Sequence, residues 1–413
     1  MSFSANYPTS APSLLMDFAN SNAVDPRVTF TRASTATYYD SIGTLQSAAV
    51  NSPRLDYNPS TLAAQGLLIE ESRTNSIRNS TATGAVAGTP GTLPTNWSGW
   101  SAASGITREI VGTGSEAGVN YIDFKLSGTA SAAVTFFMVF DTTNPAAASG
   151  QSWTSSTYVK LQAGSTTNIS NFTLRIDELD SGGVLLINSS VAISPTSAAL
   201  STQRSVISRT FSNASTAFAR EGIRFEVAIG LAIDITLRIG LPQLELGAFA
   251  TSVIPTSTVA LTRAADVASV NTLSPWYNAA EGTVYAESAV FNVTTQTQLV
   301  WQLVGGANST SLRSPQTTGA RLRATVGNTF SGAATGASII NNTFIKSAVA
   351  WQGLSGRLQS GAVGEDITAA TTVTGTQLNI GNLAGGSYLN GYISRLTYYP
   401  RRLTNAQLQA ITS

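Results

Sequence analysis

The sequence predicts an all-β protein, with an N-terminal segment followed by two antiparallel β-sandwiches and a short C-terminal helix. Short runs in which apolar and polar residues alternate recur along most of the 413 residues. The 35 Gly and 14 Pro divide these runs into strand lengths. Only 11% of the residues are charged, against roughly 25% in an average soluble domain, which favours Thr- and Ser-rich sheet surfaces over a helical enzyme.

Composition excludes several classes of chemistry. The chain contains no Cys and no His, so it has no disulfide, thiol nucleophile, Cys/His zinc site or histidine base. The net charge is +1 without a basic stripe, which argues against nucleic-acid binding. No apolar run is long enough for a membrane-spanning helix, and residues 1–18 lack a signal-peptide pattern, so we expect neither membrane insertion nor signal-dependent export.

The first 80 residues are rich in loops, and we expect them to form a docking segment. A short hairpin is predicted around a turn at residues 41–44, and an apolar strand over residues 66–70. Arginines and acidic residues lie close together here, which predicts fixed ion pairs. These residues are Arg32, Arg54, Arg73, Arg78, Asp40, Asp56, Glu70 and Glu71.

A Gly- and Pro-rich stretch over residues 80–99 marks a change of composition. The alternating runs after it, about eight in number, predict a jelly roll over residues 81–250. A Ser- and Thr-rich linker is expected over residues 251–272, and further strands with tight turns predict a second sandwich over residues 273–413. Trp301 and Trp351 lie mid-strand among apolar neighbours and are predicted core residues.

A capped helix is predicted at the C-terminus. Thr404 can act as the N-cap, Gln407 completes a capping box, and Leu403 and Leu408 are placed for a hydrophobic staple. Elsewhere the segments FTRAS, from residue 30, and LTRAAD, from residue 261, are similar to each other. They are too short to indicate a duplicated domain.

Three segments resemble a modular architecture of tailed-bacteriophage structural proteins. Residues 30–38 (FTRASTATY) and 66–75 (GLLIEESRTN) resemble the N-terminal module of phage head-spike and tail-fibre proteins. Residues 242–256 (PQLELGAFATSVIPT) resemble the exit of a carbohydrate-binding-module-like jelly roll. Residues 389–404 (LNGYISRLTYYPRRLT) are similar to the closing strand and helix of concanavalin-A-like, or laminin-G-like, lectin sandwiches.

This resemblance implies a structural fibre or spike protein on the exterior of a virion. Residues 1–80 would contact other virion proteins, and the jelly roll and the concanavalin-A-like lectin sandwich would project towards host-surface glycan. The resemblance also implies a homotrimer, whose weak sites would act together through avidity. It implies neither enzyme activity nor a cofactor.

Aromatic side chains are the candidate glycan-binding residues, because their rings can stack on sugar faces. Trp97 and Trp100 flank a Ser-Gly turn, and Trp276 and Tyr277 lie at the start of the last sandwich. Each pair is a candidate carbohydrate-binding site. Packing at the sandwich edge or between domains is the alternative interpretation of both pairs.

Paired carboxylates could hydrolyse glycosidic bonds without histidine. Glu70 and Glu71 are adjacent on a strand, so they point to opposite faces and cannot share one cleft. Asp177 and Asp180 precede a Ser-Gly-Gly turn and are typical of a hairpin tip. We therefore expect no catalysis. Asp177 and Asp180 are also the calcium candidates, although they lack the ligand spacing of a known loop, and no other metal or cofactor is expected.

Three alternatives to glycan adhesion stay open. The protein could be a decoration or collar spike that contacts only virion proteins, a depolymerase of surface polysaccharide, or a secreted adhesin. A cleft with two convergent carboxylates would favour the depolymerase. The missing export signal argues against the secreted adhesin.

Overall fold

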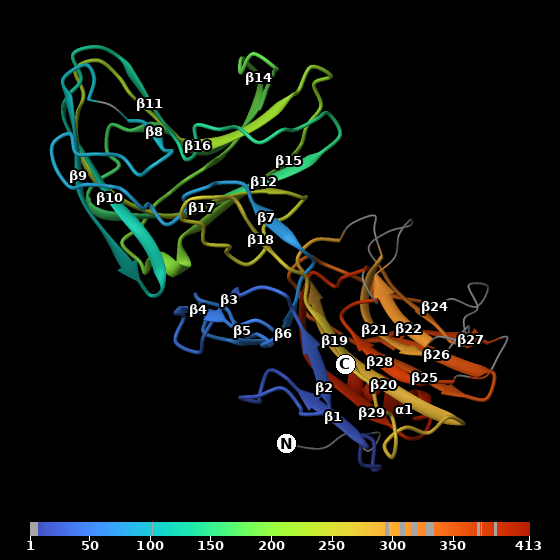
Figure 1. Cartoon of the computed structure of the whole chain (residues 1–413). Coiled ribbons are helices and arrows are strands. Elements are labelled where there is room, and N and C mark those ends of the chain that lie inside the picture. The colour runs from blue at the N-terminus through green and yellow to red at the C-terminus, as the bar shows by residue number, and fades with distance from the viewer. Residues whose placement is uncertain are drawn as a thin grey trace.

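The structure is a computed structural model that describes residues 7–100, 102–293, 297–305, 310–314, 321–326, 334–369, 372, 374–383 and 386–413. The described elements are β-strands apart from one 3₁₀ turn, η1 (Leu200–Thr202), and one helix, α1 (Asn405–Thr412). The strands form two sandwiches (Figure 1). The predicted all-β class, with antiparallel sandwiches and a short C-terminal helix, is confirmed. Within the described ranges, no helix has the length and apolar character needed to cross a membrane.

One sandwich, which we call the lectin-like sandwich after the sequence resemblance of its closing strand, consists of an eight-stranded and a seven-stranded sheet. The first has the order β27–β26–β25–β20–β29–β6–β5, with β1 also paired to β29, and the second has the order β2–β19–β28–β21–β22–β23–β24. The strands of the first sheet are β1 (Leu14–Asp17), β5 (Leu55–Tyr57), β6 (Ala64–Ile69), β20 (Glu281–Val290), β25 (Ile345–Gln352), β26 (Ser355–Ser360), β27 (Val363–Thr368) and β29 (Gly391–Tyr399). Those of the second are β2 (Val28–Thr31), β19 (Val267–Val270), β21 (Gln298–Val304), β22 (Thr310–Ser314), β23 (Arg321–Thr325), β24 (Ala334–Ser338) and β28 (Gln377–Ile380).

The N-terminal strands complete these two sheets. β1 and β6 pair along the same edge of β29, and β2 pairs with β19. Met16 of β1 and Ile69 of β6 are buried in the shared core. Strands from residues 1–80 therefore belong to the lectin-like sandwich and not to a segment of their own, and the docking role expected for these residues stays a prediction. The backbone groups and apolar side chains of this segment find their partners inside the lectin-like sandwich.

The other sandwich, which we call the jelly-roll domain, consists of two five-stranded sheets with the orders β15–β12–β17–β10–β9 and β14–β13–β16–β11–β8. All ten strands lie within residues 81–250. The strands of the first sheet are β9 (Ile106–Glu116), β10 (Val119–Thr129), β12 (Ser152–Gly164), β15 (Arg204–Thr210) and β17 (Ala232–Leu246). Those of the second are β8 (Ser98–Gly99), β11 (Val134–Val139), β13 (Ser170–Leu179), β14 (Leu185–Ala192) and β16 (Phe218–Val227).

The jelly-roll domain is inserted into the lectin-like sandwich. The chain leaves through β7 (Arg73–Asn75) and returns through β18 (Leu261–Arg263), and these two strands pair as a ribbon between the sandwiches (Figure 1). The expected linker over residues 251–272 therefore contains β18 and β19, and the lectin-like sandwich resumes before residue 273. The predicted hairpin around residues 41–44 forms a second ribbon, in which β3 (Ala36–Tyr39) pairs with β4 (Leu45–Ala48).

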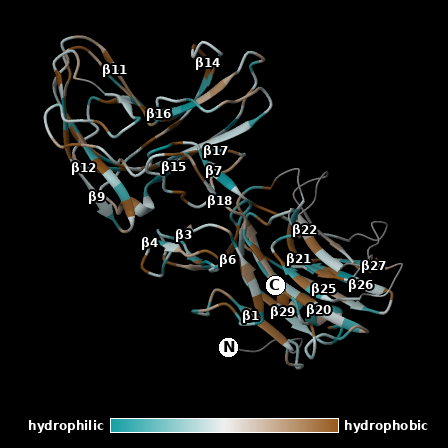
Figure 2. Cartoon of the chain, viewed as in Figure 1, coloured by the Kyte–Doolittle hydropathy of each residue, from teal (hydrophilic) through white to brown (hydrophobic). Residues whose placement is uncertain are grey.

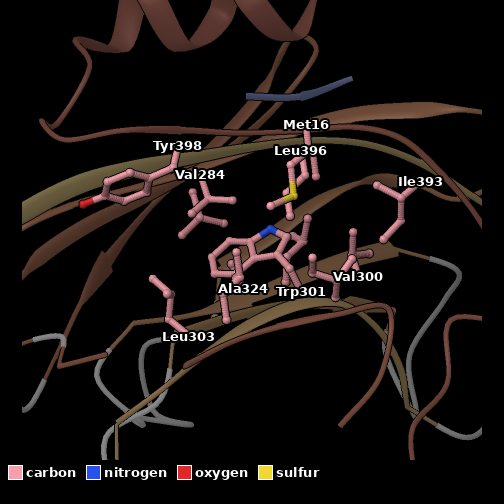
Figure 3. Close-up of a cluster of buried hydrophobic side chains, with 14 of the residues drawn as sticks. Met16, Val284, Val300, Trp301, Leu303, Ala324, Ile393, Leu396 and Tyr398 are labelled. Carbon is pink, nitrogen blue, oxygen red and sulfur yellow. The ribbon is translucent and has the colours of Figure 1, made fainter. Parts of the chain in front are cut away.

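Apolar side chains from distant parts of the chain form the core of the lectin-like sandwich. Hydrophobic and hydrophilic residues alternate along many strands of both sandwiches (Figure 2). Trp301 is fully buried and lies among Met16, Val284 and Leu396, which come from three other strands (Figure 3). Trp351 is also fully buried, so the predicted core role of both tryptophans is confirmed.

The C-terminal helix has the predicted cap. The Thr404 hydroxyl accepts a hydrogen bond from the Gln407 backbone N–H, and the Gln407 side chain accepts one from the Thr404 N–H. Leu403 and Leu408 are buried against β20 and β25, where they contact a cluster that includes Tyr285. The helix therefore covers the outer face of the eight-stranded sheet.

A buried ionic cluster lies where the chain passes between the two sandwiches. It consists of Arg32, Arg54, Glu70, Arg263 and Asp266, whose side chains are at most 1% exposed. Asp266 accepts hydrogen bonds from Arg54 and, at 3.1 Å, from Arg32. Glu70 lies 2.9 Å from Arg54 and 3.5 Å from Arg263. Each buried charge therefore has at least one counter-ion, which buried ions require.

The cluster also binds the segment that follows the jelly-roll domain. Both oxygens of Glu70 accept hydrogen bonds from Ser252, one from its backbone N–H at 2.7 Å and one from its hydroxyl at 2.6 Å. Burial alone would raise the pKa of Glu70, but Arg263 and Arg54 outweigh burial and lower it to about 2. Glu70 is therefore ionised at ordinary pH and holds the two sandwiches in one arrangement.

Removing the Asp266 carboxylate should destabilise the whole molecule. We expect Asp266→Asn to lower the free energy of unfolding by about 3–5 kcal/mol, because Arg32 and Arg54 would stay buried with a counter-ion lost. Urea denaturation followed by tryptophan fluorescence measures this change. Asp25→Asn is the matched control, since it breaks a pair with Arg27 at the surface, where the two side chains are 17% and 42% exposed, and it should cost less than about 1 kcal/mol. Equal losses in the two variants would contradict the stabilising role of the cluster.

Candidate functional site

A cavity of about 280 Å³ lies at the joint between the two sandwiches. β3 contributes Tyr38 and Tyr39, and β5 contributes Tyr57. Arg204 of β15 and residues 250–253 approach from the jelly-roll domain. The polar side chains that line the cavity include Asp56, Asn58, Gln65, Glu70, Arg204 and Asn342. The cavity thus combines aromatic rings with several hydrogen-bonding groups, as small-ligand sites usually do.

The wall nearest the jelly-roll domain is fixed by hydrogen bonds. The hydroxyls of Tyr39 and Tyr158 lie 2.6 Å apart. Arg204 donates to the Thr251 carbonyl at 2.9 Å and to the Ser156 hydroxyl at 2.8 Å. Burial raises the pKa of Tyr39, and the neighbouring Tyr158 adds to the effect, so both phenols stay neutral and can donate as well as accept.

Two carboxyl groups line the cavity, and their environments differ. Asp56 accepts hydrogen bonds from the Tyr39 N–H at 2.6 Å and from the Tyr392 hydroxyl at 2.8 Å. Burial raises the pKa of Asp56 to about 6 in spite of these bonds. Glu70, by contrast, belongs to the ionic cluster and has a pKa of about 2. The Asp56 carboxyl therefore titrates with a pKa of about 6, while Glu70 stays charged at that pH.

The structure buries the tryptophans that the sequence made candidates for glycan binding. Trp97 is 5% exposed and packs on Phe140, and its indole N–H donates to the Asn79 carbonyl at 2.8 Å. Trp100 is 2% exposed and packs between Phe124 and Phe225. Neither ring has a face open to a sugar, so packing replaces the glycan-binding interpretation for both.

The second aromatic pair also packs inside the protein. Trp276 is 5% exposed, and its indole N–H donates to the Thr272 carbonyl at 3.0 Å. Tyr277 is half-buried, and its ring lies against those of Trp276 and Tyr398. This pair closes one end of the lectin-like core and does not line the cavity at the joint.

The calcium candidates are not brought together. Asp177 is fully buried and accepts hydrogen bonds from Arg175 and Arg220, whereas Asp180 lies in an exposed turn and accepts from the backbone N–H groups of Gly182 and Val184. Across the described residues, no group of three or more acidic side chains could hold a metal ion. The calcium interpretation of Asp177 and Asp180 is therefore wrong.

The cavity residues were missed because they come from elements that are far apart in the sequence. Tyr38 and Tyr39 precede the turn of the β3–β4 hairpin, and Tyr57 precedes Asn58 and Pro59. Aromatic residues beside turn residues were the available signal, since loop-proximal rings tend to be partly exposed. The pattern could not show that these loops face each other.

A buried carboxyl group inside the jelly-roll domain was also missed. Glu221 of β16 is 1% exposed, and the Ser155 hydroxyl is the group beside its carboxyl that lowers its pKa, too weakly to offset burial. Burial raises its pKa to about 8, and the carboxylates of Glu245 and Asp141 add to the effect. Glu221 is therefore largely protonated at neutral pH and is enclosed within the fold.

The raised pKa of Glu221 predicts that the protein loses stability as the pH rises. The folded protein holds this proton more tightly than the unfolded chain, so the stabilisation is complete below pH 4.5 and is lost as the pH rises to about 8. We expect Glu221→Gln to flatten this dependence and to stabilise the protein at pH 8. Unfolding midpoints at a series of pH values measure it.

A carboxyl group on the same strand provides the control for this experiment. Hydrogen bonds from Asn171 and Arg224 lower the pKa of Glu226, so its contribution is lost as the pH falls and has the opposite sign. Glu226→Gln should therefore keep the decline between pH 4.5 and 8. An unchanged pH profile for Glu221→Gln would contradict the protonated state of Glu221.

Comparisons with known proteins place the chain only at the level of fold. No family model matches the sequence, and no curated protein matches it. Among solved structures, Trypanosoma rangeli sialidase in complex with the inhibitor DANA aligns over 35% of this chain and 26% of its own length, with 12% identity and a TM-score of 0.30.

Two other solved structures align with larger shares of the chain. Domains LG4–5 of the mouse laminin α1 chain align over 66% of this chain and 88% of their own, at 9% identity and a TM-score of 0.23. The CBM22-1–CBM22-2 tandem of Paenibacillus barcinonensis Xyn10C aligns over 77% and 99%, at 9% identity and a TM-score of 0.22. This distant similarity concerns β-sandwich architecture alone, and it assigns no activity to the chain.

Proposed function

We propose that this protein is a non-enzymatic binding protein that holds a neutral glycan in the cavity between its two sandwiches. The observation that carries the proposal is the meeting of tyrosine rings and amide side chains in that cavity. Apolar ring faces contact the C–H groups of a sugar, and amides and hydroxyls satisfy its hydroxyl groups. The cavity volume of about 280 Å³ is close to the lower end of the roughly 300–1,000 Å³ usual for ligand pockets, which suits one or two sugar rings.

The lining supports recognition of hydroxyl groups more than recognition of charge. Asn58, Gln65 and Asn342 offer both donors and acceptors. The Arg204 guanidinium is held by Thr251 and Ser156, so it is oriented before a ligand arrives. Groups fixed in advance lose little freedom on binding, which favours affinity in a small site.

A glycoside hydrolase is the second candidate function. One observation favours it: Asp56 and Glu70 share the cavity, and their pKa values of about 6 and about 2 are displaced in opposite directions, as in acid and base pairs. We favour binding because Glu70 is fully buried in the ionic cluster and both its oxygens already accept hydrogen bonds. Asp56 likewise has both oxygens occupied, by Tyr39 and Tyr392.

We also propose that the protein is exposed on the exterior of a phage particle as a homotrimeric fibre or spike. The support is the sequence resemblance of residues 30–38, 66–75 and 389–404 to such proteins. Three copies of one modest site would act at high effective concentration on a surface that repeats the same glycan. A decoration spike that contacts only other particle proteins is the alternative, and it would need no open cavity.

Truncation of a cavity tyrosine should weaken glycan binding. We expect Tyr57→Ala to reduce affinity for neutral bacterial-surface oligosaccharides about tenfold, or ~1.4 kcal/mol, because one stacking face is lost. A glycan array followed by calorimetry on the bound oligosaccharides measures this loss. Tyr7→Ala is the matched control, since Tyr7 is 49% exposed and lies outside the cavity.

Two outcomes would contradict this proposal. Absence of binding by the full chain across the array would favour the decoration spike. Release of reducing ends from a bound polysaccharide by the wild-type protein, lost in Asp56→Asn, would establish hydrolysis instead. Binding that is equal in wild type and Tyr57→Ala would place the glycan elsewhere on the molecule.

The oligomeric state tests the proposed fibre or spike role, and this test is separate from the test of glycan binding. We expect native mass spectrometry of the purified chain to give three times its 42.9 kDa mass, because fibre and spike proteins of the resembled type are trimers. A monomer at micromolar concentration would contradict the fibre or spike assignment. That result would leave glycan binding in the cavity to be judged by its own experiment.

A further inference from the structure

An aromatic ring lies between two arginines on the outer face of a jelly-roll sheet. Phe137 of β11 is half-buried, and the guanidinium carbons of Arg175 and Arg220 lie 5.3 Å and 5.2 Å from its ring centre. The sheet with β14, β16, β11 and β8 lies in the part of the molecule away from the lectin-like sandwich (Figure 1). This group is therefore separate from the cavity at the joint.

Strand register explains why these side chains meet. Gly222 of β16 pairs with Val139 of β11 on one side and with Arg175 of β13 on the other. A Cβ atom at Gly222 would lie 2.8 Å from the Phe137 ring. Because Gly222 has no side chain, the Phe137 ring can lie against the backbone of β16, next to the two arginines.

The buried carboxylate of Asp177 binds both Arg175 and Arg220. Asp177 is fully buried and accepts from Arg175 through one oxygen and from Arg220 through the other, the latter at 2.7 Å. The bonds use Nε of Arg175, and Nε and Nη2 of Arg220. Their other guanidinium nitrogens donate no hydrogen bond within the described part of the chain. Two oriented donor groups are therefore available beside the ring.

The surroundings of this group leave an excess of positive charge. Arg224, on the same face of β16, pairs with Glu226, and Asp177 offsets one of the two arginines. Three arginines thus face two carboxylates. The strand on the other side of β13 presents Asn188, Ser190 and Ala192, which are small or polar and exposed. A ligand could lie across this face without meeting a bulky side chain.

We infer that Phe137, Arg175 and Arg220 form a second binding site, which takes a sugar that carries a carboxylate. The ring would hold the two guanidinium groups that lie over it, and their free N–H groups would hold the carboxylate of the sugar. A planar guanidinium fork matches a carboxylate better than it matches a neutral hydroxyl. Uronic acids and sialic acids share this chemistry, and binding to the two kinds of sugar can be measured separately.

Binding of two acidic oligosaccharides by the full-length chain tests this inference. The probes are oligogalacturonate and oligosialic acid, and the methyl ester of oligogalacturonate is the uncharged counterpart. We expect at least one acid to bind, with affinity that falls as salt increases, and the ester to bind about tenfold or more weakly. Calorimetry measures all three. Absence of binding by both acids, or equal binding of the ester, would overturn the inference.

Two variants locate the site. We expect Phe137→Ala to weaken acid binding about tenfold, because it removes the ring over which both guanidinium groups lie. Ser190→Asp places a negative charge opposite Arg175 at an exposed position without disturbing the core, and it should weaken binding at least as much. Ser115→Asp, which adds the same charge at an exposed position on the other sheet, should have no effect.

The test of acid binding at Phe137 does not depend on whether the cavity at the joint binds a neutral glycan. Tyr57→Ala should leave binding of the acidic probe unchanged, because that residue lines the other site. Acid binding that survives both Phe137→Ala and Ser190→Asp would overturn the assignment to this face. Thermal unfolding of each variant identifies any loss that is caused by misfolding, and Ser190→Asp keeps the test valid if Phe137→Ala does not fold.

Discussion

The buried ionic cluster around Asp266 and Glu70 is the constraint on which the arrangement of the two sandwiches depends. Glu70 lies at the end of β6, directly before the chain leaves for the jelly-roll domain, and Asp266 lies between the returning strand and β19. Arg54 binds both carboxylates. Glu70 also accepts two hydrogen bonds from Ser252. The segment that leads into the jelly-roll domain and the segment that leads out of it are therefore bound to each other at Glu70. The cavity is formed beside that point, so its shape depends on the same ions.

Strand positions were predictable from the sequence, but their pairing was not. Alternation and turn residues indicated most strands, and the terminal cap at Thr404 could be read directly because all its partners lie within four residues. Arg32, by contrast, binds Asp266, 234 positions away. The two similar segments, around Arg32 and Arg263, indicated no shared partner in the sequence, yet both arginines contact Asp266. Period-two patterns identify the buried face of a strand, but they do not identify its neighbour.

The candidate site shows the same limit. Tryptophan is a common sugar-stacking residue, yet Trp97 and Trp100 lie inside the jelly-roll core because their large apolar rings pack there against other aromatic rings. Half-buried tyrosines form the cavity instead, and the nearby turn, which is the local signal for Tyr39, does not show what the ring faces. Its exposure is decided by contact between the hairpin and a domain that begins dozens of residues later. Site prediction from one sequence therefore fails where a site is built at a domain joint.

The chain has few charged residues, and several of them lie in buried ion pairs and not on the surface. Of a small number of charged residues, five are used inside the joint, and others, such as Asp177, are buried beneath a sheet face. Charge here chiefly orients groups, while Ser, Thr, Asn and Tyr supply much of the polar surface. A surface of this kind binds by hydrogen bonds and ring stacking, which are short-range and weak singly. Affinity for an extended surface would then require several sites on one molecule, and the ion pairs at the joint set how the proposed cavity site and the proposed Phe137 site are placed relative to each other.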